Sequence, residues 1–245
     1  MQPYHVALFD FDGTLCDSCD SIIADIEATF THFDKPCPKR AHLMTVMENG
    51  ISMTESLKML NPELMASGPA LLESWLDTYR QISRKNKRPM FEGVATVINA
   101  LKAANIKVLI VSNNTEANIL RSLKRMKLEK QIDQIFAISE DYPLKPDPSV
   151  FQHFILPAYA TFPSNSFMMI GDTATDLQFA QNIGIDSCWA EYGIGNVEDC
   201  EALNPTHRIN SLMDVVPVLL GTQSQTQNKY LDVKTDYAHH RRSLW

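Results

Sequence analysis

Two aspartates separated by a single residue, Asp10 and Asp12, stand directly after the apolar run Val6–Phe9. Alternate side chains of an extended segment point to the same side, so both carboxylates can face one point. Gly13 follows them and allows a sharp turn, and Thr14 adds a hydroxyl. Taken alone, the segment also fits an ordinary solvated turn after a strand.

Two further segments carry polar side chains that could contact a ligand. Ser112 and Asn113 come directly after the apolar run Lys107–Val111. Their hydroxyl and amide groups could hold a phosphate oxygen, although the same residues also make ordinary turns. Lys145 precedes Pro146, which stiffens the loop and could aim the lysine inward. A lone lysine, however, is usually solvated.

A second pair of aspartates, Asp172 and Asp176, follows the apolar run Phe167–Ile170. Residues four apart can lie on one face of a helix, near an N-terminus that favours negative charge. Helix capping is the competing interpretation of this pair.

The combination of these segments is more specific than any one of them. If the carboxylates of Asp10, Asp12, Asp172 and Asp176 converge, they repel one another, and a cation must sit among them. Ligation by oxygen atoms alone favours Mg²⁺ over zinc. Lys145 could supply the remaining positive charge.

The elements that must position these residues alternate between strands and helices, which predicts a doubly wound parallel sheet in an α/β fold. Residues 1–15 and 89–221 are expected to form the α/β core. Residues 16–88 show only helical patterns and are expected to form an inserted α-helical domain. Residues 222–245 form a polar tail with no expected catalytic role. The predicted strands are Val6–Phe9, Lys107–Val111, Ile135–Ile138, Phe167–Ile170 and Cys188–Ala190.

Composition narrows the class of protein. The 245 residues include 22 basic and 29 acidic side chains, and this net charge of −7 argues against a nucleic-acid binder. No apolar run approaches the ~20 residues of a membrane helix, and the first residues do not resemble a secretory signal. Five cysteines, an odd number, indicate reduced thiols and a cytoplasmic protein.

In their order and spacing, the segments DFDGTL (10–15), VSNN (111–114), KPDP (145–148) and GDTATD (171–176) resemble the haloacid dehalogenase superfamily of phosphohydrolases. The helical insertion resembles the cap of its phosphoglycolate-phosphatase-like branch. The resemblance covers residues ~5–220. It implies a Rossmann-like core, an aspartyl-phosphate intermediate, Mg²⁺ and a small phosphorylated substrate.

The resemblance also implies a role for each motif residue. Asp10 would be the nucleophile, and Asp12 would be the general acid and then the general base. Metal ligands would be Asp10, the backbone carbonyl of Asp12, Asp172 and Asp176. The residues that would contact phosphate are Gly13, Thr14, Ser112, Asn113 and Lys145, with Ser112 and Lys145 also counted as catalytic.

Three features of the insertion remain open to two interpretations. Cys16 and Cys19 could form a redox pair or half of a metal site, but the absence of a second C-x-x-C and of a nearby His pair favours two structural thiols. The segment Arg80–Arg88 contains five basic residues and no acid. It could bind a second anionic group of a substrate or simply form a solvated helix end. Gly50 resembles the small residue of the cap's specificity loop.

The sequence therefore predicts a Mg²⁺-dependent phosphomonoester hydrolase. A phosphosugar mutase would use the same Asp10 and Asp12, and a nucleotidase or pyrophosphatase is also compatible. The cap is expected to move about two hinges, Cys16–Ser18 and Arg88–Gly93. The sequence specifies neither the substrate nor the oligomeric state.

Overall fold

The computed structural model describes residues 3–222, in which six parallel strands form one sheet. The strand order is β3-β2-β1-β4-β5-β6, with each neighbouring pair parallel. This is the predicted doubly wound arrangement, in which the chain order reverses beside β1 and opens a crevice at the carboxyl ends of the strands. The strands are β1 (Val6–Phe9), β2 (Lys107–Val111), β3 (Gln134–Phe136), β4 (Phe167–Gly171), β5 (Asp186–Ala190) and β6 (His207–Ile209).

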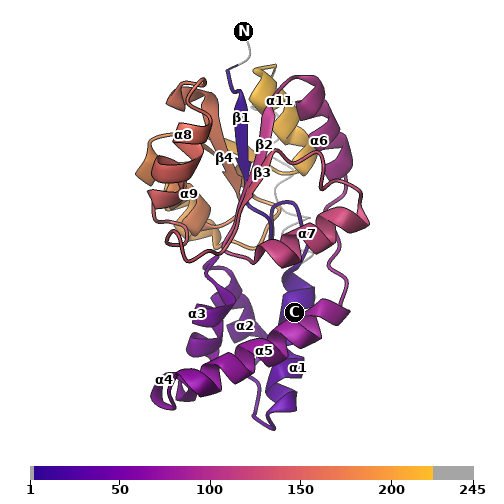
Figure 1. Ribbon diagram of the computed structural model, residues 1–245, viewed down its shortest axis with the longest axis vertical. Helices are drawn as coiled ribbons and strands as arrows, with labels where there is room; N and C mark the ends of the chain where they lie inside the picture. Colours follow the sequence, from indigo (N-terminus) through magenta and orange to yellow (C-terminus); the bar gives the residue numbers. More distant parts are fainter. Residues whose placement is uncertain (1–2, 223–245) are drawn as a thin grey trace.

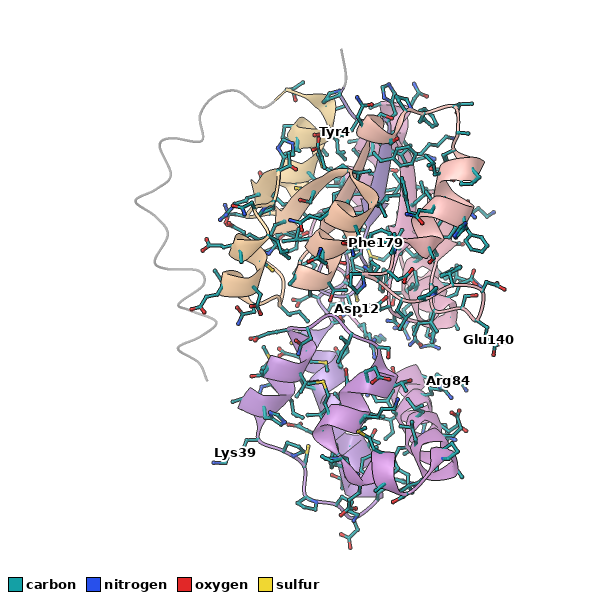
Figure 2. All side chains as sticks on the ribbon, turned by 90° about the vertical axis from the view of Figure 1, so that its left-hand side faces the viewer. Tyr4, Asp12, Lys39, Arg84, Glu140 and Phe179 are labelled. Carbon is teal, nitrogen blue, oxygen red and sulfur yellow. The ribbon has the colours of Figure 1, made fainter. Side chains whose placement is uncertain are left out.

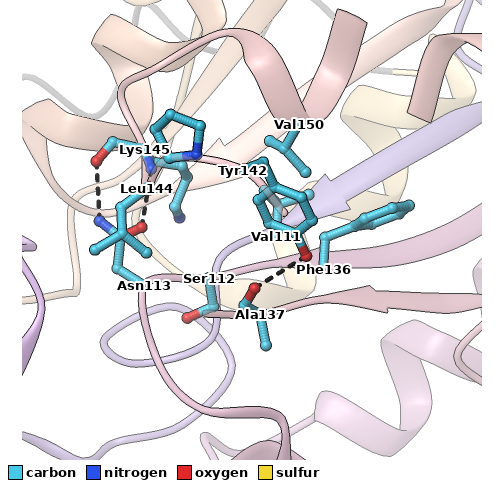
Figure 3. A pocket seen from close by; sticks show the side chains of 10 residues that line it. Val111, Ser112, Asn113, Phe136, Ala137, Tyr142, Leu144, Lys145 and Val150 are labelled. Carbon is cyan, nitrogen blue, oxygen red and sulfur yellow. Dashed lines mark hydrogen bonds between the residues drawn. The ribbon is translucent and has the colours of Figure 1, made fainter. Parts of the chain in front are cut away.

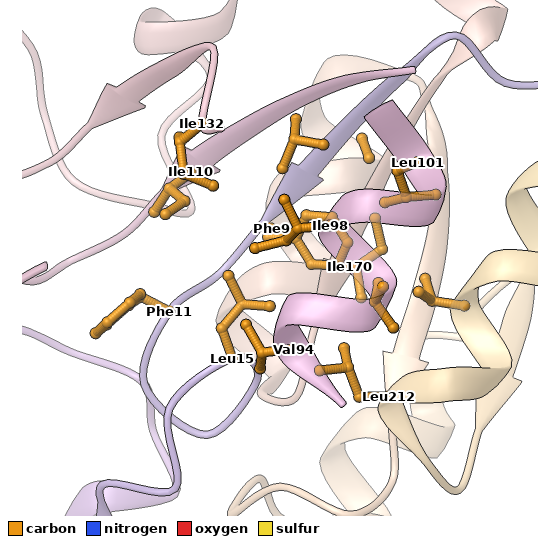
Figure 4. Packing of buried hydrophobic residues seen from close by; sticks show 14 of the residues in the cluster. Phe9, Phe11, Leu15, Val94, Ile98, Leu101, Ile110, Ile132, Ile170 and Leu212 are labelled. Atoms are coloured by element: carbon orange, nitrogen blue, oxygen red, sulfur yellow. The ribbon is translucent and has the colours of Figure 1, made fainter. Parts of the chain in front are cut away.

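Helices cover both faces of the sheet, so the central strands are apolar throughout. Within β1, Ala7 and Phe9 join one buried cluster, whereas Val6 and Leu8 join another on the opposite face. Figure 4 shows Phe9 packed with Ile98 and Ile170 in the first cluster. The helices of the sheet domain are α6 (Val94–Ala103), α7 (Glu116–Arg125), α8 (Leu156–Ala158), α9 (Ala174–Ile183), α10 (Val197–Ala202) and α11 (Val215–Leu220).

Between β1 and α6 the chain forms five helices, in agreement with the predicted helical insertion. They pack around a buried cluster of their own, in which the ring of Phe33 stacks on Trp75 with centroids 4.5 Å apart. Figure 1 shows this helical domain beyond the carboxyl ends of the strands. Its helices are α1 (Cys19–His32), α2 (Arg40–Met47), α3 (Met53–Leu60), α4 (Glu63–Ala66) and α5 (Pro69–Lys85).

Two connections join the helical domain to the sheet, and they run side by side. Cys16 and Met90 form an isolated antiparallel bridge. The backbone N–H of Asp17 donates to the carbonyl of Pro89 at 2.9 Å, and that of Phe91 donates to Leu15 at 3.0 Å. The two ends of the insertion are therefore fixed to each other at the edge of the crevice.

Several local elements differ from the predicted pattern. The segment Phe151–Ile155 is a π-helical turn, and Pro157 follows it, where a regular helix would need a backbone N–H. The apolar pattern of Ser211–Leu220 predicts one helix, but the structure has a 3₁₀ turn (Leu212–Asp214) followed by α11, in which Pro217 occupies the tolerant first turn. Within residues 3–222, no helix is long and apolar enough to cross a membrane. The predicted tail lies outside these residues, apart from Thr222.

Candidate active site

Asp10 and Lys145 meet at the carboxyl end of β1. The Lys145 ammonium donates to Oδ1 of Asp10 at 2.7 Å and to Oδ1 of Asp176 at 2.6 Å. The lysine side chain is only 3% exposed, which rejects the alternative of a solvated lysine. Oδ2 of Asp10 accepts no hydrogen bond from residues 3–222. One oxygen of this carboxylate is thus held, and the other is available.

Asp172 is fully buried at the end of β4 and is held by the first loop of the chain. Its two oxygens accept hydrogen bonds from Oγ1 of Thr14 at 2.8 Å and from the backbone N–H of Ile194 at 2.9 Å. Gly13 has φ +84°, and a Cβ there would lie 2.2 Å from Oδ2 of Asp172. Only glycine fits this close approach.

The predicted phosphate contacts of Gly13 and Thr14 therefore need correction. The N–H of Gly13 donates to the carbonyl of Cys16 at 2.8 Å, and the Thr14 hydroxyl is used by Asp172. Thr14 has no exposed surface. These groups position Asp172 because the loop folds back under it, so they do not reach toward a ligand.

Asp176 serves two tasks that the sequence presented as alternatives. Its Oδ2 accepts hydrogen bonds from the N–H and the hydroxyl of Thr173, at 3.0 and 2.8 Å, which completes a capping box at the start of α9. Its Oδ1 faces the Lys145 ammonium. Helix capping thus fixes the orientation of the carboxylate that faces the site.

Asp10, Asp172 and Asp176 form a buried acidic triad whose oxygen atoms lie within 4.8 Å of one another. Burial raises the pKa of Asp10 to about 7, although Lys145 lowers it. Burial, Asp176 and Asp10 raise the pKa of Asp172 well above its usual range. One lysine does not balance three carboxylates, so the triad has the charge and the oxygen donors that a divalent cation such as Mg²⁺ requires.

The side chain of Asp12 turns away from this triad, so the four predicted carboxylates do not all converge. Oδ2 of Asp12 accepts a hydrogen bond from the amide of Asn114. Oδ1 is buried without a hydrogen-bond partner, and Nη1 of Arg88 lies 3.7 Å away. Figure 2 shows Asp12 at the junction of the two domains. Only the backbone of Asp12 remains as a source of a metal ligand.

Ser112 and Asn113 follow β2, and their side chains differ in what they can bind. Ser112 is 6% exposed, and its hydroxyl has no hydrogen-bond partner within residues 3–222. Asn113 exchanges two hydrogen bonds with the backbone of Lys145, at 2.9 and 3.0 Å, as Figure 3 shows. The Asn113 side chain therefore positions the Lys145 loop, which leaves only its backbone for the predicted phosphate contact.

A loop of the helical domain reaches this site. The amide of Asn113 also donates to the carbonyl of Gly50 at 3.0 Å, and the Thr175 hydroxyl donates to the carbonyl of Asn49 at 2.6 Å. Gly50 has φ +62°, and a Cβ there would lie 2.4 Å from Oγ1 of Thr173. The α2–α3 loop thus rests directly on the carboxyl ends of β2 and β4.

Three groups near the site have roles that the sequence did not identify. Arg88 and Asn114 contact Asp12, and the turn Gly193–Gly195 supplies the N–H that binds Asp172. The only indication of Arg88 in the sequence was the positive charge of the segment Arg80–Arg88, which did not show that Arg88 contacts Asp12. Cys16 and Cys19 are not joined in a disulfide: the Cys16 thiol donates to the carbonyl of Pro89, and the Cys19 thiol faces the sulfur of Met44.

Comparisons with known proteins find a matching family model and named relatives. A family model described as haloacid dehalogenase-like hydrolase matches residues 7–190. The pyrophosphatase PpaX of Halalkalibacterium halodurans is 23% identical over 219 residues, which cover 88% of this chain and 96% of that protein. The phosphoglycolate phosphatase of Psychrobacter arcticus is 25% identical over 225 residues, with coverages of 87% and 94%.

Solved structures share the fold over nearly their whole length. A protein of Haemophilus somnus 129pt, described as a predicted phosphoglycolate phosphatase, has a TM-score of 0.77 at 17% identity, covering 89% of this chain and 99% of that one. The HAD-hydrolase YfnB of Bacillus subtilis, described as bound to magnesium, has a TM-score of 0.67 at 22% identity, with coverages of 88% and 98%.

Proposed function

This chain belongs to the haloacid dehalogenase-like hydrolase family, and on that premise we propose that it is a Mg²⁺-dependent hydrolase of small phosphomonoesters. The observation that carries the proposal is the available Oδ2 of Asp10, beside the Lys145 ammonium and within the buried acidic triad. Held at one oxygen and available at the other, this carboxylate is suited to nucleophilic attack.

In the first half-reaction, Oδ2 of Asp10 attacks phosphorus. A bond from phosphorus to Asp10 forms while the bond from phosphorus to the leaving oxygen breaks. Asp12 donates its proton to that oxygen, so an alcohol departs. The product is a phosphoryl group on Asp10, which divides one difficult displacement into two easier ones.

In the second half-reaction, water attacks the phosphoryl group on Asp10. Asp12, now a carboxylate, removes a proton from this water, and inorganic phosphate leaves as the bond to Asp10 breaks. Asp12 is then protonated again and ready for the next turnover. One residue can perform both transfers because its side chain lies outside the triad and is regenerated as the acid when it takes the proton of the water.

The remaining groups bind and neutralise the phosphoryl oxygens. The Lys145 ammonium and the Ser112 hydroxyl supply donors in a buried setting, where such contacts are strong. Mg²⁺, when bound by the acidic triad and the Asp12 carbonyl, would supply the positive charge that lets two anions approach each other. Pre-set donors of this kind provide most of the stabilisation in phosphoryl transfer.

The helical domain, residues 16–88, is proposed to act as a cap over this site. The α2–α3 loop rests on Asn113 and Thr175, which favours a pose that excludes bulk water. Substrate entry then requires the cap to lift about its two connections, near Cys16–Ser18 and Arg88–Gly93. The related YfnB structure is described as revealing interdomain movement, which supports this part of the proposal.

The names of the relatives suggest first substrates for an assay, namely phosphoglycolate and pyrophosphate. The proposal is tested by measuring phosphate release from these and from p-nitrophenyl phosphate, with Mg²⁺ and with excess chelator. Chelation is expected to abolish release.

Asp10→Asn is expected to abolish phosphate release while the protein stays folded, because the amide oxygen is a poor nucleophile. Asp199→Asn, on the exposed surface of α10, is the matched control and should retain activity. Near-normal turnover by the Asp10 variant, purified free of host phosphatases, would rule out this nucleophile.

A further inference from the structure

The surroundings of Asp12 describe the place where a leaving group must lie. If Asp12 protonates the leaving oxygen, as the proposed function requires, the rest of the leaving group occupies the space beside Asp12. On the side of the sheet domain Asp12 contacts Asn114, and on the side of the helical domain the nearest cation is Arg88. A leaving group beside Asp12 would therefore meet the positive charge of Arg88.

Arg88 is fixed by the helical domain, with one nitrogen directed to Asp12. Its Nη2 donates to the hydroxyls of Tyr79 and Ser83, both at 2.9 Å, and lies 3.3 Å from Oδ2 of Asp25. Its Nη1 lies 3.7 Å from Oδ1 of Asp12, too far for a hydrogen bond. That oxygen is buried and has no hydrogen-bond partner. The Arg88 guanidinium and the Asp12 carboxylate are thus neighbours that are not hydrogen-bonded to each other.

A second path of contacts leads from Asp12 to α7. The amide of Asn118 donates to Asn114 at 3.0 Å, and Nη1 of Arg121 donates to Asn118 at 3.1 Å. Arg125 stands one helical turn beyond Arg121. Figure 1 shows α7 next to the end of α5, which carries Arg84, and Figure 2 places Arg84 at the edge of the helical domain that faces the sheet.

Unlike Arg88, the other three arginines at this junction have no acidic partner among the described residues. No carboxylate of residues 3–222 forms an ion pair with Arg84, Arg121 or Arg125. Burial lowers the pKa of Arg121, and the like charges of Arg125, Arg84 and Arg88 lower it further. Arg80, one turn before Arg84, differs because Glu73 and Asp77 bind it at 2.6 and 2.8 Å. A solvated helix end therefore describes Arg80 and does not account for the others.

We propose that Arg84, Arg88, Arg121 and Arg125, here called the arginine cluster, bind a second anionic group carried by the leaving group of the substrate. The inference rests on the proposed function and specifies its substrate class. The substrates are small phosphomonoesters or phosphoanhydrides whose leaving group bears a carboxylate or a phosphoryl group. Arg88, nearest to Asp12, contacts that anion, and the three arginines at the domain junction attract it.

The test compares two substrates that differ only in this charge. Phosphoglycolate carries a carboxylate, and phosphoglycolamide carries a neutral amide of the same size. The intact protein with Mg²⁺ is expected to show a kcat/KM at least tenfold higher for phosphoglycolate. In Arg121→Gln and Arg125→Gln this preference should fall about tenfold, because each variant weakens the attraction for the anion.

Lys35→Gln is the matched control, because it also removes one positive charge, here from the helical domain. Lys35 forms an exposed ion pair with Glu63, the first residue of α4. Its preference between the two substrates should equal that of the wild type. The melting temperature of the Arg125 variant should not fall, because Arg125 makes no ion pair and repels its neighbours. A loss of preference without a loss of stability separates ligand binding from a structural role.

Three results would overturn the inference. The arginine cluster does not recognise the leaving group if the wild type hydrolyses both substrates equally well, or if the arginine variants keep the full preference for phosphoglycolate. In either case the proposed phosphatase activity stands. If neither substrate nor p-nitrophenyl phosphate is hydrolysed with Mg²⁺, the proposed function itself fails, and the inference fails with it.

Discussion

Asp10 and Asp12 show how two identical side chains, two residues apart, acquire different chemistry. Asp10 and Asp176 both accept a hydrogen bond from the Lys145 ammonium inside the buried acidic triad. Asp12 faces an amide and a guanidinium at the domain junction. The proposed mechanism therefore assigns nucleophilic attack to the carboxylate beside Lys145 and the acidic triad, and proton transfer to the carboxylate that lies outside the triad.

Replacing Asp12 by Asn separates the two proton transfers. Asn keeps the size of the side chain and the backbone carbonyl, but it cannot exchange a proton usefully. With an alkyl phosphate, both half-reactions should slow and kcat should fall by about 10²–10⁴. With an aryl phosphate, whose leaving group departs as an anion, Asp10 should still become phosphorylated. Stopped-flow measurement should then show a burst of about one equivalent of aryl alcohol, followed by little turnover.

The phosphoryl group trapped in this experiment should be labile to hydroxylamine and located on Asp10 by mass spectrometry. Steady turnover of the aryl substrate by the Asp12 variant, with no burst and no trapped intermediate, would assign water activation to another residue.

The sequence predicted which residues stand at the strand ends but not how each is used there. Asp10, Ser112 and Asp172 were identifiable because apolar runs precede them, and parallel strands end at one edge. The tasks of Thr14 and Asn113 were not identifiable, because their hydrogen-bond partners are distant in the chain. The partner of Thr14 is 158 residues away, and the two partners of Asn113 are 63 and 32 residues away. In the sequence, a hydroxyl or amide side chain that binds a ligand cannot be distinguished from one that binds another loop.

At the scale of elements, Asp133 joins two units of the sheet domain just before β3. It accepts hydrogen bonds from Lys102 of α6 at 2.7 Å and from the N–H of Val108 in β2 at 2.8 Å, and Lys107 lies 3.3 Å away. Burial favours the protonated acid, but these donors outweigh it and hold the pKa of Asp133 below its usual range.

Asp133→Asn is therefore expected to lower the free energy of unfolding by about 1–2 kcal/mol at pH 7. Because the pKa is depressed in the folded state, this stabilisation is present above pH ~4 and is lost as the pH falls through the folded pKa. Urea unfolding of both proteins should give curves that converge in acid. An equal difference at pH 7 and pH 3 would contradict the charge-based explanation.

The long elements were predictable from periodicity, whereas the short ones were not. The stripes of α1 and α5 and the apolar runs of β1, β2 and β4 correspond to the expected segments. The short elements α10 and β6 were missed, because six and three residues contain too few repeats to show a period. The π-helical turn before Pro157 depends on a missing backbone donor and leaves no mark in the apolar pattern.

At the scale of the whole molecule, the contact of the α2–α3 loop with the strand ends determines whether the proposed cap can close. Gly50→Ala places a Cβ 2.4 Å from Oγ1 of Thr173, which is too close for two non-bonded atoms, so this pose should become unfavourable. We expect kcat/KM to fall by about tenfold or more, with a larger radius of gyration in solution scattering.

Gly184→Ala is the matched control for this variant. Gly184 also has a positive φ, +70°, but a Cβ there meets nothing within 4 Å. Both variants should lose about 1 kcal/mol of stability from the backbone, and only the Gly50 variant should lose activity. Equal activity losses, or an unchanged scattering profile in the Gly50 variant, would disconnect the loop contact from closure.

The central place of β1 has a consequence for how the protein is made. Its neighbours in the sheet, β2 and β4, begin at residues 107 and 167, so the first strand leaves the ribosome long before either partner exists. Helices α1–α5 emerge next, with an apolar cluster that needs almost no later residue. Vectorial synthesis thus favours a folded helical domain first, with β1 unpaired until the chain has passed residue 111 and paired on both sides only after residue 171.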